Sequence, residues 1–400
     1  MLGAGIQETS VPQASANDLH FPPPRLPDEV TALRAEVRAF LANSLAADAW
    51  QPNSDFGAGF APEFSRQIAA KGWIGMTWPK DYGGHGRSNL ERYVVTEELL
   101  AAGAPVFAHW IADRQSGPLL LRFGSEAQRQ TLLPRIAAGE CFFSIGMSEP
   151  DSGSDLASVR TLAERTPAGW RLNGAKVWTS NAHLNHFMIT LCRTGEAGED
   201  RHGGLSQFLI DLQQDGVTIN PIVNMLGTHE FNEVLFDDVE IPEDRLIGQE
   251  GDGWRQVTSE LAYERSGPER FLSNFHIFRT LIDAIGPEPD ARQAEAIGRL
   301  TGRLWTLRRM SLSVAAMLEA GESPDVEAAI VKELGNRFER EVVETSRAVY
   351  AVQPATSPGG NAADFPALMA EAILRQPSFT LRGGTTEIMR SIIARGLGLR

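Results

Sequence analysis

The sequence predicts an α+β protein with several domains, in which a block of strands lies between two helical blocks. From Pro27 to about Gly139, apolar residues recur every three or four positions, as on amphipathic helices. From Cys141 to Gly248 the spacing changes to two, which favours strands, and from Trp254 onward the helical spacing returns. A chain of 400 residues is long enough to bury a large core across these blocks.

These changes of spacing give the expected domain boundaries. In the N-terminal helical block, His109 and Trp110 are expected to pack in the core, with lining a ligand as the alternative. A cluster of Pro and Gly at 78–86 separates two helices. The expected units are a flexible tail (1–26), a helical domain (27–140), a β-domain (141–250) and a C-terminal helical domain (251–400).

Composition excludes several functions and indicates a compartment. The net charge of −14 argues against nucleic acid or an anionic membrane as a partner, because both select clustered Lys and Arg. No apolar run of about 18 residues predicts a membrane span. The two cysteines form neither a disulfide framework nor a metal motif, and the first 24 residues contain no Arg or Lys, as a transit peptide would. We therefore expect a cytoplasmic protein.

The segment from Met147 to Asp155 predicts a ligand-binding loop. It contains hydroxyl side chains and one proline, and Gly153 permits close approach of the backbone to a ligand. Such a loop can place N–H and O–H groups against a flat polar molecule.

The segment from Gly169 to Ser180 predicts a β-hairpin that turns at Asn173-Gly174, the strongest short signal for a type I′ turn. Alternation along its second strand places Trp178 and Ser180 on one face and Thr179 on the other. An indole beside a hydroxyl suits an aromatic heterocycle with polar edges. The alternative is a β-domain with a surface loop and a buried tryptophan.

Together these segments resemble the flavin-binding region of the acyl-CoA dehydrogenase family. The matching motifs are S-E-P-x-x-G-S-D (148–155), L-N-G-x-K-x-W (172–178) and the following T-S-N, and the resemblance extends from about residue 28 to the C-terminus. It implies a central β-barrel-like domain, a C-terminal four-helix bundle and FAD as cofactor. The positions that the resemblance assigns to the cofactor are Ile145, Met147, Ser148, Gly153, Ser154, Trp178, Ser180, Thr385 and Glu387.

The catalytic base is expected at an unusual place. Members of the family remove an α-proton from an acyl-CoA with a carboxylate, while the β-hydride passes to flavin N5, and the product is a trans-2-enoyl-CoA. In most members the base lies in a loop near the C-terminus, where this chain has Gly383. A minority resembling isovaleryl-CoA and long-chain enzymes carry it in a Glu-Arg pair after the β-domain, here Glu264-Arg265.

The residues around Glu264 support that choice. Apolar positions such as Val257 and Phe271 indicate a helix buried on one side, and burial raises the pKa of a carboxyl group. Pro268 lies four residues further on, so the helix is expected to kink at Glu264. The alternative is a solvated Glu-Arg pair on an ordinary helix.

The resemblance also implies how the thioester is bound. The backbone N–H of Gly383 is expected to bind the thioester oxygen, where a donor is worth about 3 kcal/mol at the transition state. The expected substrate-binding positions are Ser154, Arg265, Arg382 and Gly383.

The chain departs from the family where homotetramers complete a neighbour's FAD site. The first such segment is replaced by Arg292–Ala296, and the second survives at most as a remnant at Gln353–Gly360. This erosion resembles one subunit of the bacterial heteromeric acyl-CoA dehydrogenases. A heterotetramer with a related chain is therefore expected, with a homo-oligomer as the alternative and an electron-transfer flavoprotein or similar carrier as acceptor.

Two other functions stay open. The chain could be a flavin-free partner subunit, or a flavin oxidase or monooxygenase on the same scaffold. The sequence does not determine the acyl group, although a glycine opposite the proposed base leaves room for branched, long or polycyclic chains.

Overall fold

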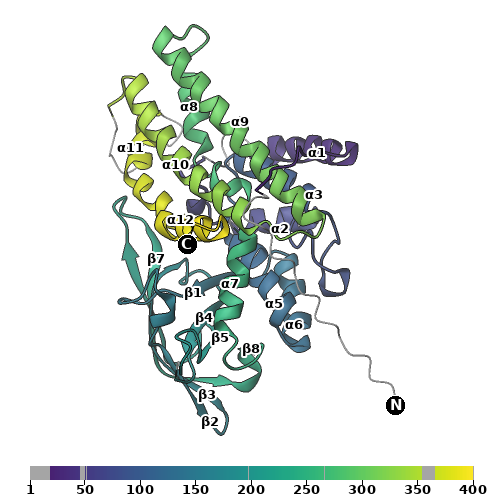
Figure 1. The fold of residues 1–400 in the computed structure, drawn as a ribbon, viewed down its shortest axis with the longest axis vertical. Helices are drawn as coiled ribbons and strands as arrows, with labels where there is room; N and C mark the ends of the chain where they lie inside the picture. The colour runs from purple at the N-terminus through teal and green to yellow at the C-terminus, as the bar shows by residue number, and fades with distance from the viewer. Residues whose placement is uncertain are drawn as a thin grey trace.

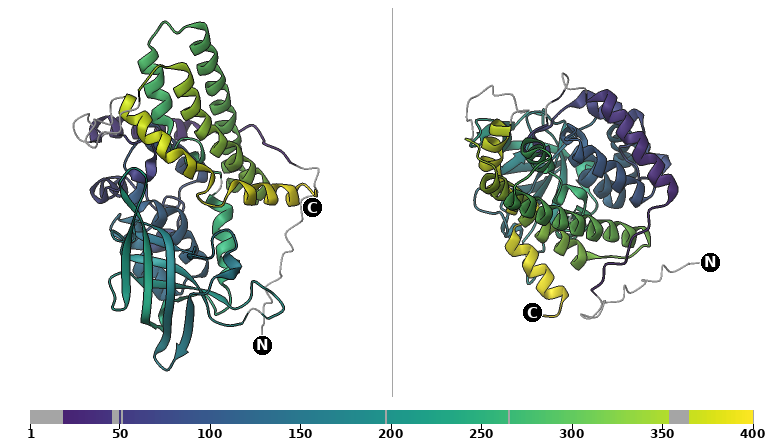
Figure 2. Two further views of the ribbon diagram at one scale, coloured as in Figure 1. Left: turned by 90° about the vertical axis from the view of Figure 1, so that its left-hand side faces the viewer. Right: turned by 90° about the horizontal axis from the view of Figure 1, so that it is seen from above.

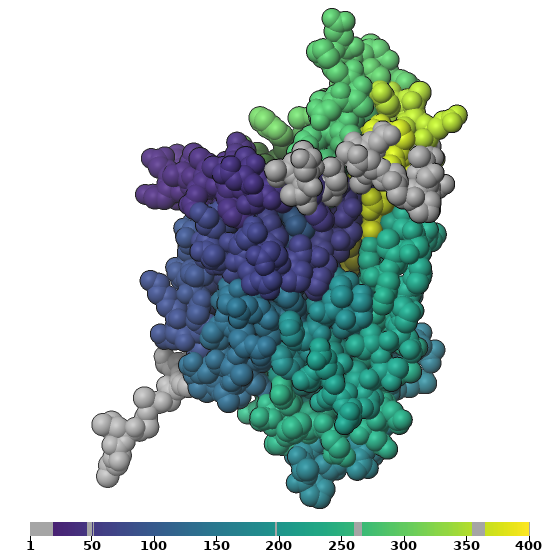
Figure 3. All heavy atoms as spheres, turned by 180° about the vertical axis from the view of Figure 1, so that it is seen from behind, coloured from purple at the N-terminus to yellow at the C-terminus, as the bar shows by residue number. Residues whose placement is uncertain are grey.

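The fold was obtained as a computed structural model, which describes residues 19–45, 50, 52–196, 198–264, 266–353 and 365–399, without the side chains of 260–264. Helices at the N-terminal side and a sheet pack side by side, and the C-terminal helices lie across one end of both (Figures 1 and 3). Most of the expected tail, the residue Arg265 and nearly all of the Gln353–Gly360 segment fall outside the described residues.

Six α-helices form the described N-terminal part, and the sequence motifs at their starts explain two of them. Ser88 and Ser125 each accept a backbone N–H three residues on, and Glu91 and Gln128 complete reciprocal capping boxes. His109 and Trp110 are buried as expected. The helices are α1 (Asp28–Ser44), α2 (Pro62–Ala70), α3 (Asn89–Ala101), α4 (Phe107–Ile111), α5 (Gly117–Phe123) and α6 (Glu126–Ala137).

The middle of the chain forms an eight-stranded sheet in which β6, β7, β3, β2, β4, β5 and β8 follow one another and β1 pairs with β4. A single bridge, Leu162 to Arg193, joins β2 to β4, so the sheet folds into two halves. The rings of Trp170 and Phe208 meet across the shared core with centroids 5.2 Å apart. The strands are β1 (Phe143–Gly146), β2 (Leu162–Thr166), β3 (Gly169–Ser180), β4 (Phe187–Arg193), β5 (Leu205–Asp211), β6 (Val217–Val223), β7 (His229–Pro242) and β8 (Leu246–Ile247).

The prediction of a hairpin turn at Asn173-Gly174 is wrong. The whole segment Gly169–Ser180 is one strand, and the hairpin with β2 turns immediately before it. Asn173-Gly174 instead forms an irregularity in the pairing with β7, where the Asn173 side chain accepts the N–H of Asp238. Gly174 has φ 145°, and a Cβ there would lie 2.7 Å from the Thr161 hydroxyl, so glycine serves a bulge and a close contact rather than a turn.

The C-terminal part is helical, and α10 packs against α8, α9, α11 and α12. Helix α7 runs from the sheet into this bundle (Figures 1 and 2). The prediction of a kink at Glu264 is also wrong, because α7 ends at that residue. Pro268 begins a separate 3₁₀ turn, and at the start of a turn its missing N–H breaks no hydrogen bond. The helices are α7 (Gly253–Glu264), α8 (Phe275–Ile285), α9 (Ala291–Glu319), α10 (Asp325–Val349), α11 (Phe365–Arg375) and α12 (Thr386–Gly396).

None of the helices in the described part of the chain combines the length and the apolar character that crossing a bilayer requires.

Candidate active site

Trp178 lies on a strained, open bulge of β3. Its φ of 59° is left-handed, a region that a bulky residue rarely occupies, and its side chain is 62% exposed although it is a tryptophan. Thr179, next along the strand, is buried, and Ser180 beyond it is half-buried. Strain of this kind concentrates at ligand sites, and here it presents an indole to the outside of the sheet.

The loop from Met147 to Asp155 is held against the same strand. The backbone N–H of Val177 donates to the Ser148 carbonyl at 2.9 Å, so Ser148 lies beside the residue that precedes Trp178. Gly153 and Ser154 are exposed further along the loop. The half-buried Ile145 lies on β1, immediately before the loop.

A buried ion pair locks loop and strand together, and the sequence reasoning missed it. The ammonium of Lys176, in the L-N-G-x-K-x-W motif, donates to the Glu149 carboxylate at 2.7 Å and to the Met147 carbonyl at 3.1 Å. The same carboxylate accepts hydrogen bonds from the backbone N–H groups of Arg160 and Thr161 at 2.6 and 2.9 Å. Burial opposes ionisation of Glu149, but Lys176 and these donors outweigh it and hold the pKa below its usual range.

The second predicted region is the glycine loop before α12. Gly383 and Gly384 have φ of 62° and 93°, which only glycine adopts without strain. The Thr385 hydroxyl accepts the Ile388 N–H as the N-cap of α12, and Glu387 is exposed in its first turn. Gly383 is exposed, so its backbone is open to a ligand.

The Arg382 side chain turns away from this loop into the protein. Its guanidinium donates to the Asp55 carboxylate at 2.8 and 2.9 Å, to the Ser273 hydroxyl at 2.6 Å and to Glu339 at 3.2 Å. Burial raises the pKa of Glu339 to about 7, against the opposing effect of Arg382. The Arg382 side chain is thus engaged in an internal cluster, and only the backbone of this predicted substrate-binding residue belongs to the open loop.

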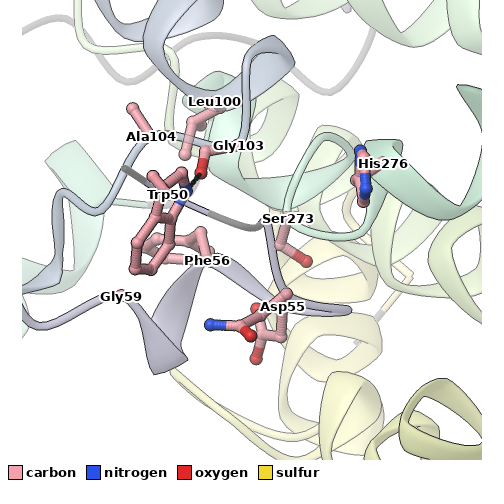
Figure 4. Close-up of a pocket in the computed structure, with 10 residues that line it drawn as sticks. Trp50, Asp55, Phe56, Gly59, Leu100, Gly103, Ala104, Ser273 and His276 are labelled. Carbon is pink, nitrogen blue, oxygen red and sulfur yellow. Dashed lines mark hydrogen bonds between the residues drawn. The ribbon is translucent and has the colours of Figure 1, made fainter. Parts of the chain in front are cut away.

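Asp55 and Ser273 also border a small pocket with Trp50 and Phe56 (Figure 4). None of the ten residues that line it is among the predicted site residues. This pocket therefore does not coincide with the loop and strand described above.

The 3₁₀ turn that follows α7, Pro268–Arg270, approaches the glycine loop through the Arg270 side chain. Ser266, two residues beyond the helix, has its carbonyl bound by the Ser311 hydroxyl of α9. A Cβ built on Gly383 would lie 3.3 Å from the guanidinium of Arg270, six residues after Glu264. The side chains of Glu264 and Arg265 are outside the described residues.

An ion pair connects the two predicted regions. Arg375, at the end of α11, donates two hydrogen bonds to the Glu230 carboxylate at 2.5 and 2.8 Å. The carbonyl of Glu230 in turn accepts the N–H of Asn181 at 2.8 Å, directly after Ser180. This chain of contacts ties the strand that carries Trp178 to the helix preceding the glycine loop.

Comparison with known proteins defines the class. The family model "Acyl-CoA dehydrogenase, N-terminal domain" matches residues 27–140, that for the middle domain matches 144–239, and that for the C-terminal domain matches 290–398. The fold and these matches define an oxidoreductase built from three such domains.

Sequence similarity to a known relative extends along nearly the whole chain. It is 37% identical over 391 residues to "Acyl-CoA dehydrogenase IpdE1" of Mycobacterium tuberculosis, covering 93% of this chain and 98% of the relative. The chain therefore belongs to the acyl-CoA dehydrogenase family, whose members bind FAD.

Solved structures give the same result. The crystal structure of the ChsE4-ChsE5 complex from Mycobacterium tuberculosis matches with a TM-score of 0.78 and 28% identity, over 94% of this chain and 99% of that one. "Tcur3481-Tcur3483 steroid ACAD" matches with a TM-score of 0.79 and 25% identity, over 94% and 98%.

Proposed function

We propose that this chain catalyses the FAD-dependent α,β-dehydrogenation of an acyl-CoA thioester to the trans-2-enoyl-CoA, with Glu264 as the base that removes the α-proton. The observation that carries this assignment is the position of Gly383. The glycine loop offers backbone N–H groups but no carboxylate, while α7 ends at Glu264 and the chain beyond it approaches Gly383 through Arg270. One element then supplies the base and the other supplies the donors for the thioester oxygen.

The residues around Trp178 fit the flavin. An exposed indole on a strained bulge suits stacking with an aromatic ring, and the loop locked beside it by Glu149 and Lys176 provides hydroxyl and backbone groups for polar edges. Bound FAD would supply the hydride acceptor. Thr385 and Glu387, at the start of α12, are proposed to contact it from the other side, and Ser154 to lie near the CoA arm.

Replacing Glu264 by Gln tests the base. A positioned base contributes up to about 10⁴-fold, so turnover should fall by roughly 10³-fold or more while folding and flavin content stay unchanged. The matched control is Glu250→Gln, an exposed carboxylate shortly before the same helix, which should retain full turnover. Turnover retained by Glu264→Gln would refute the assignment.

We further propose that a related chain completes the FAD site in a heterotetramer. Arg292, in the segment that replaces the one lent by homotetrameric members, donates to the carbonyls of Ala348 and Val349 at 2.9 and 3.4 Å. It closes the C-terminal end of α10 within this chain, so it is not free to reach a neighbour's cofactor. Trp305 on α9 is 69% exposed and offers apolar surface to a partner, and the similar ChsE4-ChsE5 structure is a complex.

The visible spectrum and the flavin-to-chain ratio test this assembly. Protein expressed alone should be colourless or deficient in flavin, and co-expression with a related chain should bring flavin to a fixed ratio. A ratio near one FAD per chain in the protein alone would instead establish the homo-oligomer. The reduced enzyme is proposed to pass its electrons to an electron-transfer flavoprotein or a similar carrier.

Polycyclic acyl groups are the first substrates to try. The reason is that the similar Tcur3481-Tcur3483 structure is that of a steroid ACAD. The missing side chain at Gly383 does not itself open room for the acyl group, because a Cβ there would lie 3.3 Å from the Arg270 guanidinium and 3.4 Å from the Lys332 ammonium. Bleaching of the flavin by steroid side-chain, branched and long-chain acyl-CoA thioesters would rank the three classes.

A further inference from the structure

Lys332 makes an unusual set of contacts with the glycine loop. Its ammonium donates to the carbonyls of Arg382 and Gly384 at 2.9 and 2.7 Å, and also to the carbonyl of Gly383 between them. The side chain comes from the first third of α10 and is completely buried. Three consecutive carbonyl groups therefore converge on one cation.

This convergence determines where the N–H groups of the loop point. In a trans peptide the carbonyl and the following N–H are antiparallel, and the described chain contains no cis peptide bond. Carbonyls directed at Lys332 thus direct the N–H groups of Gly383, Gly384 and Thr385 away from α10. The loop therefore presents its N–H groups on the side opposite Lys332, where the positive end of α12 follows directly.

The surroundings of Lys332 on α10 hold its ammonium against the three loop carbonyls. Its neighbours on the same face of the helix, Ala328, Gly335 and Asn336, are buried, so the side chain enters the loop from a packed face. A buried ammonium is costly unless its donors are satisfied, and the three carbonyls compensate for the lost water. The left-handed φ of Gly383 and Gly384 lets the loop curl around the cation.

We propose that Lys332 is a positioning residue for the dehydrogenation, which holds the Gly383–Thr385 backbone so that its N–H groups meet the thioester oxygen. This proposal rests on the proposed function, because it assumes that an acyl-CoA thioester binds at the loop. Lys332 touches neither substrate nor cofactor. It acts through the peptide groups on which enolate charge is stabilised.

Two ligands, one with and one without the thioester oxygen, test the contact between that oxygen and the N–H groups of the loop. One is an acyl-CoA with two methyl groups on its α-carbon, which has the thioester oxygen but no α-proton to lose. The other is the S-alkyl-CoA thioether of the same chain length, which lacks that oxygen. With the flavin-loaded protein, calorimetry should show that Lys332→Met weakens the thioester about tenfold and the thioether less than twofold.

Turnover provides a second readout. With a reactive substrate, kcat of Lys332→Met should fall about 100-fold, the effect of losing one transition-state donor, and KM should rise about tenfold, in line with the weaker binding of the thioester. Lys332→Gln keeps a shorter donor, so its thioester affinity and its kcat should lie between those of wild type and Lys332→Met.

The matched control is Val343→Ala, which removes two buried methyl groups from the same helix without touching the loop. It should lose stability but keep the wild-type preference for thioester over thioether. Equal weakening of both ligands in Lys332→Met, or loss of the folded state in both Lys332 variants, would overturn the proposal and leave Lys332 as a stability residue. If wild type itself does not bind the thioester, the proposed function fails instead.

Discussion

Replacement of Glu149 by Gln tests whether the buried ion pair holds the flavin loop on the sheet. The change leaves the Lys176 ammonium, which is fully buried, without its carboxylate, and it weakens the bonds from the N–H groups of Arg160 and Thr161. Removing one partner of a buried pair costs about 3–5 kcal/mol. Because whole proteins are stable by only about 5–15 kcal/mol, the loss is large.

The assay is urea unfolding of Glu149→Gln beside a surface control. Glu243→Gln breaks a pair with Arg165 in which both side chains are more than half exposed, so it should cost less than about 1 kcal/mol. The double variant that replaces Glu149 by Leu and Lys176 by Met should recover only part of the loss, because it removes the uncompensated charge but leaves the backbone N–H groups of Arg160 and Thr161 without their acceptor. Equal midpoints for Glu149→Gln and Glu243→Gln would refute the reasoning.

The sign of the pH dependence provides a further check on Glu149. Its pKa in the folded protein lies below the ordinary value of 4.5, so the unfolded chain binds more protons near that pH. Its contribution to stability is therefore complete above about pH 4.5 and is lost as the pH falls through the folded pKa. The difference in unfolding free energy between wild type and Glu149→Gln should narrow in acid, and a difference that widens would contradict the sign.

Two further predictions concern other parts of the site. Burial raises the pKa of Glu339 from 4.5 to about 7, so between these pH values the carboxyl group is protonated in the folded protein and ionised in the unfolded chain. The contribution of Glu339 to stability should therefore decrease as the pH rises from about 4.5 to 7 and stay constant above that. Urea midpoints of wild type and Glu339→Gln across that range check this, and a difference that is constant or rises with pH would count against it. Trp178→Gly should relieve the left-handed strain, worth about 1–2 kcal/mol, and yet lower flavin content at least tenfold, whereas Trp178→Phe should retain flavin. Absorbance and thermal unfolding measure both effects, and full flavin retention by Trp178→Gly would show that the indole is not the platform.

The three-part fold could be predicted from sequence because periodicity is a local property of the chain. A spacing of three to four identifies a helix and a spacing of two identifies a strand, whatever the partner elements are. The capping boxes at Ser88 and Ser125 are equally local. Local signals failed at Asn173-Gly174, where the same dipeptide serves a bulge because β7, some 65 residues away, pairs across it.

The sequence by itself determined the three-part fold and the absence of a carboxylate at Gly383. Only the tertiary structure decided how the polar side chains are used. The Arg382 side chain, at a predicted substrate-binding position, pairs with Asp55, 327 residues away, and the cation at the glycine loop is Lys332 from another helix. A buried charge takes whichever partner the packing brings within about 3 Å, because isolation in the low-dielectric interior is so costly, and that choice depends on distances between elements that no local pattern contains.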